Sequence, residues 1–351
     1  MITLRFCVRV FQVLLKFFRH SPVKRVKLGI EAGSRGWDSV YFEELYGSAV
    51  DYFGRNNVVR IEVIAGQSRI RQLDEYLGKH KITHLVYDPR TNYSKPAKVI
   101  IEALLVNLIC YKRGVIVLAG LTDASLTTWR LQSIIATENI GKIFSLMDVS
   151  KLGWLVLGIR ITGPHIMPIS KATLRQIKKI YEDKCLSAED FLVLKFRGTL
   201  YPTRVRFFET LNQNLENSDS KIRVQLEGKS ESEISSDNYW QTLAANKICI
   251  TTTFQYVFGG YHTNRTEINQ MIFRISEALA AGNLLFVEHY PGISKYFIPG
   301  VDFIEFYDPV DLAAKLIYFS TNTREAQRIR ESGQMSMSQK IENSIFWAEL
   351  S

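Results

Sequence analysis

The chain has 351 residues, which is enough for two domains, and 46% of them are hydrophobic, so a sizeable core is expected. Charged residues make up 23%, a proportion that excludes a disordered chain. The formal net charge is +9, but residues 1–27 hold seven Lys or Arg and no Asp or Glu, so the remainder is nearly neutral. With no long basic stripe along the body, nucleic acid is not an expected partner.

Residues 1–25 form a basic amphipathic segment. Arg5, Arg9, Lys16 and Arg19 recur at helical spacing, and bulky apolar residues fill much of the remainder. This pattern predicts contact between residues 1–20 and an anionic membrane surface. The segment is too charged and too short for a membrane span, and it has no small-residue cleavage site. The open alternative is an edge strand or a helix packed on the body.

Residues 26–165 alternate between predicted strands and helices, which indicates a parallel sheet covered on both faces. The expected strands are Val26–Ile30, Val59–Ile64, Ile82–Tyr87 and Val115–Ala119, and the expected helices are Tyr41–Phe53, Ser68–Lys79 and Lys98–Tyr111. Asp123 follows the last of these strands and is the candidate catalytic or acceptor-contacting carboxylate. A helix N-cap or turn aspartate explains it equally well. Gly163–Pro164–His165 predicts the linker to a second domain.

The second domain begins with a strand, a glycine and a helix. Phe191–Phe196 is an apolar run, Gly198 follows as a predicted turn, and Arg204 lies in the first turn of a helix expected to end near Asn214. This geometry offers backbone N–H groups to a phosphate. The alternatives are a plain tight turn at Gly198 and a solvated helix residue at Arg204. Further strands are expected at Lys221–Glu227 and Lys247–Thr253, with a helix at Asn238–Asn246 between them.

A charged pair stands out on the helix near residues 270–282. Ile272, Ile275 and Leu279 form its core face, while Arg274 and Glu277 share another face. At the carboxyl end of a parallel sheet, an Arg suits a diphosphate and a Glu suits ribose hydroxyls. The alternative is a surface ion pair, which contributes little to stability.

These two blocks resemble the donor-binding region of GT-B glycosyltransferases, especially the CgeB-like branch. The resemblance rests on Phe-x-Gly-x-x-Tyr-x-x-Arg at 196–204 and Arg-x-x-Glu-x-x-x-x-Gly at 274–282. It implies an α/β fold with two Rossmann-like domains facing across a cleft. Residues 26–165 would form the acceptor domain and 166–330 the nucleotide-sugar donor domain. Residues 331–351 would form a C-terminal helix that crosses back to the first domain.

The resemblance also implies a function. The chain would be a hexosyltransferase-like enzyme that moves a sugar from a nucleotide-sugar to a hydroxyl of a glycan, lipid-linked or small-molecule acceptor, in cell-surface glycan or glycoconjugate synthesis. Gly198, Arg204 and Arg274 would hold the donor diphosphate, and Glu277 would hold the ribose.

Neither metal nor cofactor is expected, because the sequence has no His/Cys ligand spacing and no Asp-x-Asp pair. Its four widely spaced cysteines indicate reduced thiols in a cytoplasmic protein, with peripheral attachment to the inner face of the membrane if residues 1–20 bind lipid.

Two alternatives to an active transferase stay open. The first is a non-catalytic nucleotide-binding or scaffold protein on the same frame, because no catalytic base is evident. The second is a Rossmann oxidoreductase, which the lack of Gly-x-Gly-x-x-Gly after the first strand of either domain disfavours.

Overall fold

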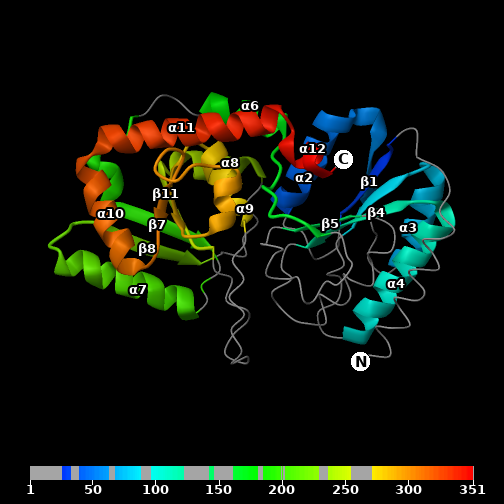
Figure 1. Cartoon of the computed structure of the whole chain (residues 1–351), viewed down its shortest axis with the longest axis horizontal. Helices are drawn as coiled ribbons and strands as arrows, with labels where there is room; N and C mark the ends of the chain where they lie inside the picture. Colours follow the sequence, from blue (N-terminus) through cyan, green and yellow to red (C-terminus); the bar gives the residue numbers. More distant parts are fainter. Residues whose placement is uncertain are drawn as a thin grey trace. The chain divides into compact units, whose positions relative to one another are not determined.

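The computed structural model divides the chain into two compact units (Figure 1). The first contains Met1–His165 together with Trp347–Ser351, and the second contains Ile166–Phe346. The structure describes residues 26–32, 39–62, 68–87, 96–121, 142–145, 161–180, 185–198, 200, 202–228, 236–253 and 271–350. The N-terminal segment 1–25, the candidate Asp123 and the segment 254–270 lie outside these ranges.

The first unit is built on a parallel sheet, as the alternating pattern predicts. Its strands run in the order β2-β1-β3-β4-β5-β6, and every pairing is parallel. The strands are β1 (Leu28–Ala32), β2 (Val58–Glu62), β3 (His84–Tyr87), β4 (Ile116–Leu121), β5 (Lys142–Ser145) and β6 (Ile161–Thr162). The helices between them are α2 (Ser39–Phe53), α3 (Arg69–Lys79) and α4 (Pro96–Arg113), with a short 3₁₀ turn η1 (Arg55–Asn57) before β2.

The core of this unit lies between the sheet and its helices. Leu73 and Leu77 are four residues apart on α3 and buried, and Val106 and Cys110 repeat that spacing on α4. Residues at this spacing share one helix face, so each helix buries a single apolar stripe against the strands. Glu31 lies in β1, just beyond the predicted end of that strand at Ile30, is buried and forms a bidentate pair with Arg69, at 2.5 and 2.6 Å.

The second unit has a parallel sheet of its own. Strands β7 and β8 pair with each other, and β9, β10 and β11 form a second hydrogen-bonded group. Because β7 also contacts β9, the strands follow the spatial order β8-β7-β9-β10-β11. The strands are β7 (Val193–Gly198), β8 (Arg223–Gly228), β9 (Ile248–Thr251), β10 (Leu284–Glu288) and β11 (Ile304–Phe306). The helices are α6 (Lys171–Ile180), α7 (Pro202–Asn217), α8 (Ser236–Ala245), α9 (Phe273–Ala280), α10 (Pro309–Thr321) and α11 (Thr323–Glu342), with 3₁₀ turns η4 (Ala188–Phe191) and η5 (Pro291–Lys295). Helix α12 (Ile345–Leu350) begins in this unit, and its residues from Trp347 onward belong to the first.

Two local predictions in this unit need correction. The predicted strand at Phe191–Phe196 starts too early, because Phe191 closes the 3₁₀ turn η4 and its ring is fully buried in the core. Gly198 is the last residue of strand β7 rather than a turn residue.

Helix α10 was not predicted, although its start has a clear signal. The Asp308 side chain accepts hydrogen bonds from the amides of Val310 and Asp311, both at 2.8 Å, and Pro309 occupies the first helical position. An N-cap aspartate followed by proline is a standard helix start. Leu312 and Leu316 then pack into the core of the unit.

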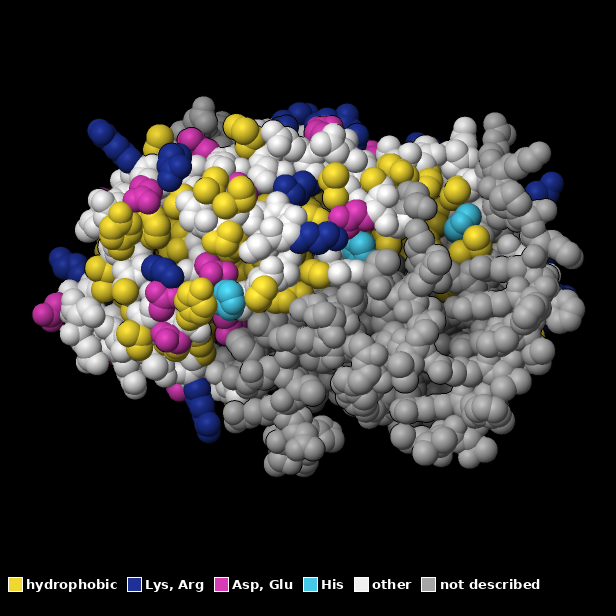
Figure 2. All heavy atoms as spheres, in the orientation of Figure 1, with side chains coloured by type: hydrophobic (Ala, Val, Ile, Leu, Met, Phe, Trp, Pro, Cys, Tyr) yellow, Lys and Arg dark blue, Asp and Glu magenta, His cyan; other side chains and the backbone are white. Residues whose placement is uncertain are grey.

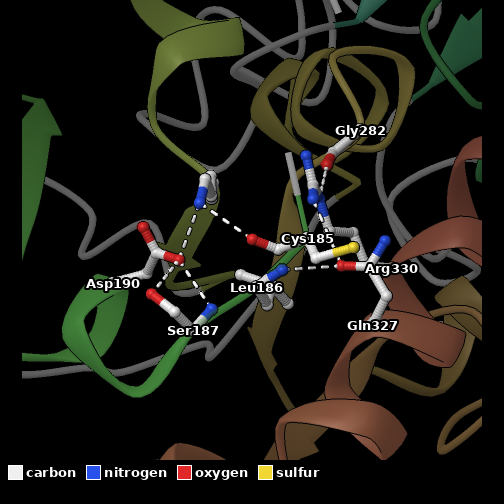
Figure 3. Close-up of polar contacts among 8 residues, drawn as sticks. Cys185, Leu186, Ser187, Asp190, Gly282, Gln327 and Arg330 are labelled. Atoms are coloured by element: carbon white, nitrogen blue, oxygen red, sulfur yellow. Dashed lines mark hydrogen bonds and ion pairs between the residues drawn. The ribbon is translucent and has the colours of Figure 1, made fainter. Parts of the chain in front are cut away.

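A polar network closes the amino edge of this sheet (Figure 3). Asp190 accepts hydrogen bonds from the Ser187 amide and from Lys247 Nζ, both at 2.8 Å. Arg330 of α11 is buried and donates from Nε to the Gly282 carbonyl, just before β10. Gln327 of the same helix accepts from the Leu186 amide at 3.0 Å. Side chains thus fix the amino ends of β7, β9 and β10. The carboxyl ends of these strands lie at the opposite edge of the sheet.

Charges on the second unit are mixed. On the face shown in Figure 2, Lys and Arg side chains alternate with Asp and Glu over this unit, and no large field of one sign forms there. Within the described ranges, no helix combines the length and the apolar character needed to cross a membrane.

The last residues of the chain pack with the first unit. The Trp347 indole donates from Nε1 to Ser48 Oγ at 3.0 Å, and its ring meets Phe53 edge-on at 5.5 Å between centroids. Glu349 Oε2 lies 2.7 Å from Nδ1 of the buried His165, so His165 has a structural partner here. Of the segment predicted to cross back, 331–351, only the stretch from Trp347 onward belongs to this unit, because α11 lies in the second.

Candidate functional site

The strand order of the second unit places a topological switch point between β7 and β9. Chain connections leave β7 toward β8 on one side, and the later strands β9, β10 and β11 lie on the other side. In open parallel sheets, ligands bind outside the carboxyl ends of the strands at such a point. The candidate residues Gly198 and Arg204 lie at this edge, because β7 ends at Gly198 and α7 begins at Pro202.

Arg204 connects the two sides of the switch point. Its Nη2 donates to Thr252 Oγ1 at 3.1 Å, and Thr252 directly follows β9. Its guanidinium lies 5.2 Å from the centre of the Phe196 ring. A methyl group on Gly198 would stand 3.2 Å from that ring, a tight approach, whereas its 3.7 Å distance to Arg204 Nη1 would be an ordinary contact, so the glycine makes room for the Phe196 ring. A cation is thus held in the first turn of α7, where the helix dipole also favours an anion.

A buried carboxylate that sequence reasoning missed lies on the next strand. Glu288 ends β10, is buried, and accepts a hydrogen bond from the Thr253 amide at 3.1 Å. Consecutive residues after β9 therefore have different partners, Thr252 on the β7 side and Thr253 on the β10 side. Glu288 fixes the path of the chain as it leaves β9. The apolar run of β10 gave no signal for this contact, because the partner is 35 residues away.

The predicted Arg274–Glu277 pair lies on α9 and is more buried than a surface pair. Arg274 Nε and Glu277 Oε2 are 3.5 Å apart, with the two side chains 26% and 5% exposed. Arg274 also lies 5.5 Å above the centre of the Tyr239 ring. The interpretation as an ordinary surface pair is therefore wrong. A nearly buried carboxylate is costly unless it is paired and hydrogen-bonded, so this arrangement depends on its neighbours.

Those neighbours come from α8 and β9. Burial and the negative charge of Glu277 raise the pKa of Tyr239 well above its ordinary value. Burial likewise raises the pKa of the Cys249 thiol to about 11, so the thiol beside the pair stays neutral at physiological pH. Tyr239 and Cys249, two neighbours of the pair, are thus both protonated and neutral.

The structure brings the predicted residues to two neighbouring places. Gly198 and Arg204 meet at the β7–β9 edge, while Arg274 and Glu277 lie together on α9, which contacts β9. The candidate Asp123 lies outside the described residues. Among the residues that the structure does describe, His, Cys, Asp and Glu form no group suited to a metal ion.

Comparison with known proteins agrees with the pattern of residues. Residues 204–344 match the family model described as "Glycosyl transferase-like". This region begins at Arg204 and includes Arg274 and Glu277. No curated protein is significantly similar to the sequence.

Solved structures resemble the chain over most of its length. The structure of HepE from Anabaena in complex with UDP aligns with a TM-score of 0.53 and 13% identity, covering 92% of this chain and 99% of that one. A second HepE structure, with UDP and glucose, aligns with a TM-score of 0.51 and 12% identity, covering 93% and 99%. A glycosyltransferase from Rickettsia africae aligns with a TM-score of 0.50 and 12% identity, covering 93% and 97%.

At these identities the likeness establishes the fold. The chain has the GT-B fold of two Rossmann-like units, and its residues 204–344 are similar to the Glycosyl transferase-like family.

Proposed function

We propose that the chain is a glycosyltransferase that moves a sugar from a nucleotide-sugar donor to an acceptor hydroxyl. The observation that carries the proposal is the position of Arg204. It lies at the start of α7 and hydrogen-bonds across the switch point to Thr252. A cation and a helix N-terminus at one sheet edge suit a diphosphate. The family match over 204–344 supports a nucleotide-sugar as the ligand that contains this diphosphate.

In the proposed mechanism, the chain stabilises the departing diphosphate by fixed charge. As the acceptor hydroxyl attacks the anomeric carbon, the bond from that carbon to the diphosphate oxygen breaks and negative charge grows on the leaving group. Arg204 and the amides at the start of α7 are in place before the reaction, so they stabilise this charge without reorganising. Arg274 adds a second cation near α9, and the reaction needs no metal for this task.

Glu277 has the second role in the proposal, which is to bind the donor ribose. A carboxylate is an acceptor only, so two ribose hydroxyls suit it. Asp123 stays the proposed acceptor-side carboxylate. The proposed setting is the cytoplasm, with residues 1–20 on an anionic membrane surface and a glycan, lipid-linked or small-molecule acceptor in cell-surface glycan synthesis.

The test is a thermal-shift screen of the purified protein against UDP, GDP, ADP and CMP, without added metal. A ligand that binds only the folded state raises the apparent melting temperature. Uridine nucleotides are the first choice, because the HepE structures hold UDP. The nucleotide that shifts the transition is then supplied as its sugar conjugates, and release of the nucleotide is measured. Binding without turnover would favour the scaffold alternative, and no binding of any nucleotide would refute the proposal.

Glu277→Gln tests the ribose assignment. Each charge-assisted hydrogen bond contributes about 1.5–3 kcal/mol, so its loss should weaken nucleotide binding roughly 10- to 150-fold. Glu216→Gln is the matched control, because Glu216 is exposed near the end of α7, far along that helix from Arg204. Titration calorimetry gives both affinities. Equal affinity in Glu277→Gln and the native chain would contradict the assignment.

A further inference from the structure

Two aromatic rings stack at the carboxyl ends of β10 and β11. The parallel register pairs Glu288 with Phe306, and the His289 amide continues it by donating to the Phe306 carbonyl at 2.7 Å. His289 and Tyr307 are therefore the next pair of residues beyond the two strands. Their rings stack with 4.7 Å between centroids and 25° between planes. The strand register thus builds an aromatic pair at this edge of the sheet.

Tyr307 is exposed and is nevertheless held in one place. The residue is 61% exposed, yet its amide donates to Asp311 Oδ2 at 2.9 Å and its hydroxyl donates to Glu305 Oε2 at 3.2 Å. Glu305 precedes it by two residues, so the two side chains lie on the same face of the sheet. The other oxygen of Glu305, Oε1, lies 2.9 Å from His289 Nδ1. An aromatic surface that is already ordered can bind a ligand with little further loss of conformational entropy.

The polar groups around the rings offer both donors and acceptors. Among the described residues, the Glu305 carboxylate has two side-chain partners, fewer than the four or so that its lone pairs can accept. Lys315 Nζ lies 5.7 Å from the centre of the Tyr307 ring and donates to Asp311 Oδ2 at 2.8 Å. The surroundings are acidic, because Glu305, Asp308 and Asp311 outnumber Lys315. This balance disfavours a phosphate, a nucleic acid or an anionic membrane as the ligand.

The combination of groups matches the surface of a neutral pyranose. One side of such a ring carries C–H groups that pack on an aromatic face, and the hydroxyls around its rim both donate and accept hydrogen bonds. The position fits as well. Because β11 is two strands from β9 and neighbouring strands lie about 4.8 Å apart, Tyr307 lies about 10 Å from the place where Arg204 meets Thr252.

We propose that His289, Glu305 and Tyr307 form a sugar-binding platform at the carboxyl ends of β10 and β11, which takes a neutral pyranose unit of the acceptor or of the donor. The choice of a sugar as the ligand rests in part on the proposed function. The platform adds a second subsite to the edge that carries Arg204, and the two differ in charge. The basic subsite suits the diphosphate, and the acidic, aromatic one suits a sugar.

The experiment titrates the full chain with the methyl glycosides of glucose, galactose, mannose and N-acetylglucosamine and follows binding by saturation-transfer NMR. If the platform takes the acceptor sugar, at least one glycoside should bind in the millimolar range. Tyr307→Ala should weaken this binding about tenfold or more, because the stacking surface is lost. Tyr307→Phe keeps the ring and should lose less.

Tyr318→Ala is the matched control. Tyr318 is exposed too and donates to a carboxylate, that of Glu325, at 2.8 Å, but it lies at the other end of α10. This variant should bind the glycosides as the native chain does. If the platform takes the donor sugar instead, calorimetry should show that Tyr307→Ala weakens UDP-glucose about tenfold and leaves UDP unchanged, because UDP has no pyranose.

The outcomes separate the platform from the function. The platform is wrong if the native chain binds none of these sugars, or if Tyr307→Ala keeps the native affinity for all of them. An equal loss of affinity for UDP and UDP-glucose would also refute it. A native chain that sediments as a dimer, with Tyr307→Ala as a monomer, would identify a second copy as the occupant. Glycoside binding through Tyr307 without binding of any nucleotide keeps the platform and refutes the donor site.

Discussion

Gly333 gives the sharpest test of packing near the site. Replacing a glycine inside a helix by alanine usually stabilises a protein, but at this position the structure predicts that the same change is destabilising. It lies buried inside α11, where replacing glycine by alanine normally stabilises a helix by about 1 kcal/mol. A methyl group on Gly333 would overlap the carbonyl oxygen of Asp302 and lie 2.9 Å from Leu279 Cδ2. The carbonyl belongs to backbone and cannot rotate away as a side chain can.

The cost follows from what has to move. Asp302 is held from both sides, because Ser332 donates to its Oδ1 and the Ile298 amide to its Oδ2, each at 2.9 Å. Overpacking of a rigid contact costs about 1–3 kcal/mol, and the backbone overlap places this site at the upper end. After the gain in helix propensity, Gly333→Ala should be destabilised by about 1–2 kcal/mol. Because 1 kcal/mol shifts a unit of this size by roughly 2–4 °C, its melting temperature should fall about 2–8 °C.

Calorimetry tests this prediction by comparing the melting temperatures of Gly333→Ala and Gly78→Ala with that of the native chain. Gly78 is also inside a helix, α3, but the atoms that its methyl group would meet, at 2.5 Å and beyond, belong to the end of the Arg113 side chain. That side chain can shift at little cost, so Gly78→Ala should be neutral or slightly stabilising. A Gly333→Ala variant that melts at or above the native temperature would refute the packing argument.

Two other contacts give predictions of their own. Burial alone would raise the pKa of Asp190, but hydrogen bonds from Lys247 and Ser187 outweigh it and hold the pKa below its usual value. This contribution to stability is present above the ordinary aspartate pKa of about 3.9 and is lost as the pH falls through the lower folded value. Asp190→Asn should therefore be less stable than the native chain in urea at pH 7, with the difference shrinking below about pH 4; a constant difference would contradict the linkage. Trp347→Phe removes the buried hydrogen bond to Ser48 and should destabilise the first unit by about 1–3 kcal/mol in urea unfolding, and an unchanged midpoint would show that this bond contributes nothing.

The sequence predicted the elements of the fold better than the contacts of the site. Alternating apolar runs and helical periods are local signals, and they placed β8 and the helix that carries Glu277. The N-cap of α10 is also local, so that helix was open to prediction from Asp308 and Pro309. The end of β7 was misplaced, because a glycine often marks a turn and here it extends a strand instead.

The partners within the site could not be found in the same way. Arg204 and Thr252 are 48 residues apart, and Thr253 and Glu288 are 35 apart. Their meeting depends on which strands become neighbours, and no spacing in the sequence encodes that. The burial of Glu277 has the same origin, since Tyr239 and Cys249 reach it from other elements. Spacing alone favoured a surface ion pair.

The return of Trp347 and Glu349 to the first unit has a consequence for synthesis on the ribosome. The second unit, Ile166–Phe346, is made between two parts of the first. At a translation rate of roughly 5–20 residues per second, about 10–40 s separate His165 from its partner Glu349. During that interval the nascent first unit holds Ser48, Phe53 and His165 without the residues that cover them. The first unit to begin folding is therefore the last to be completed, and chaperones that protect exposed apolar surface would be needed most at this stage.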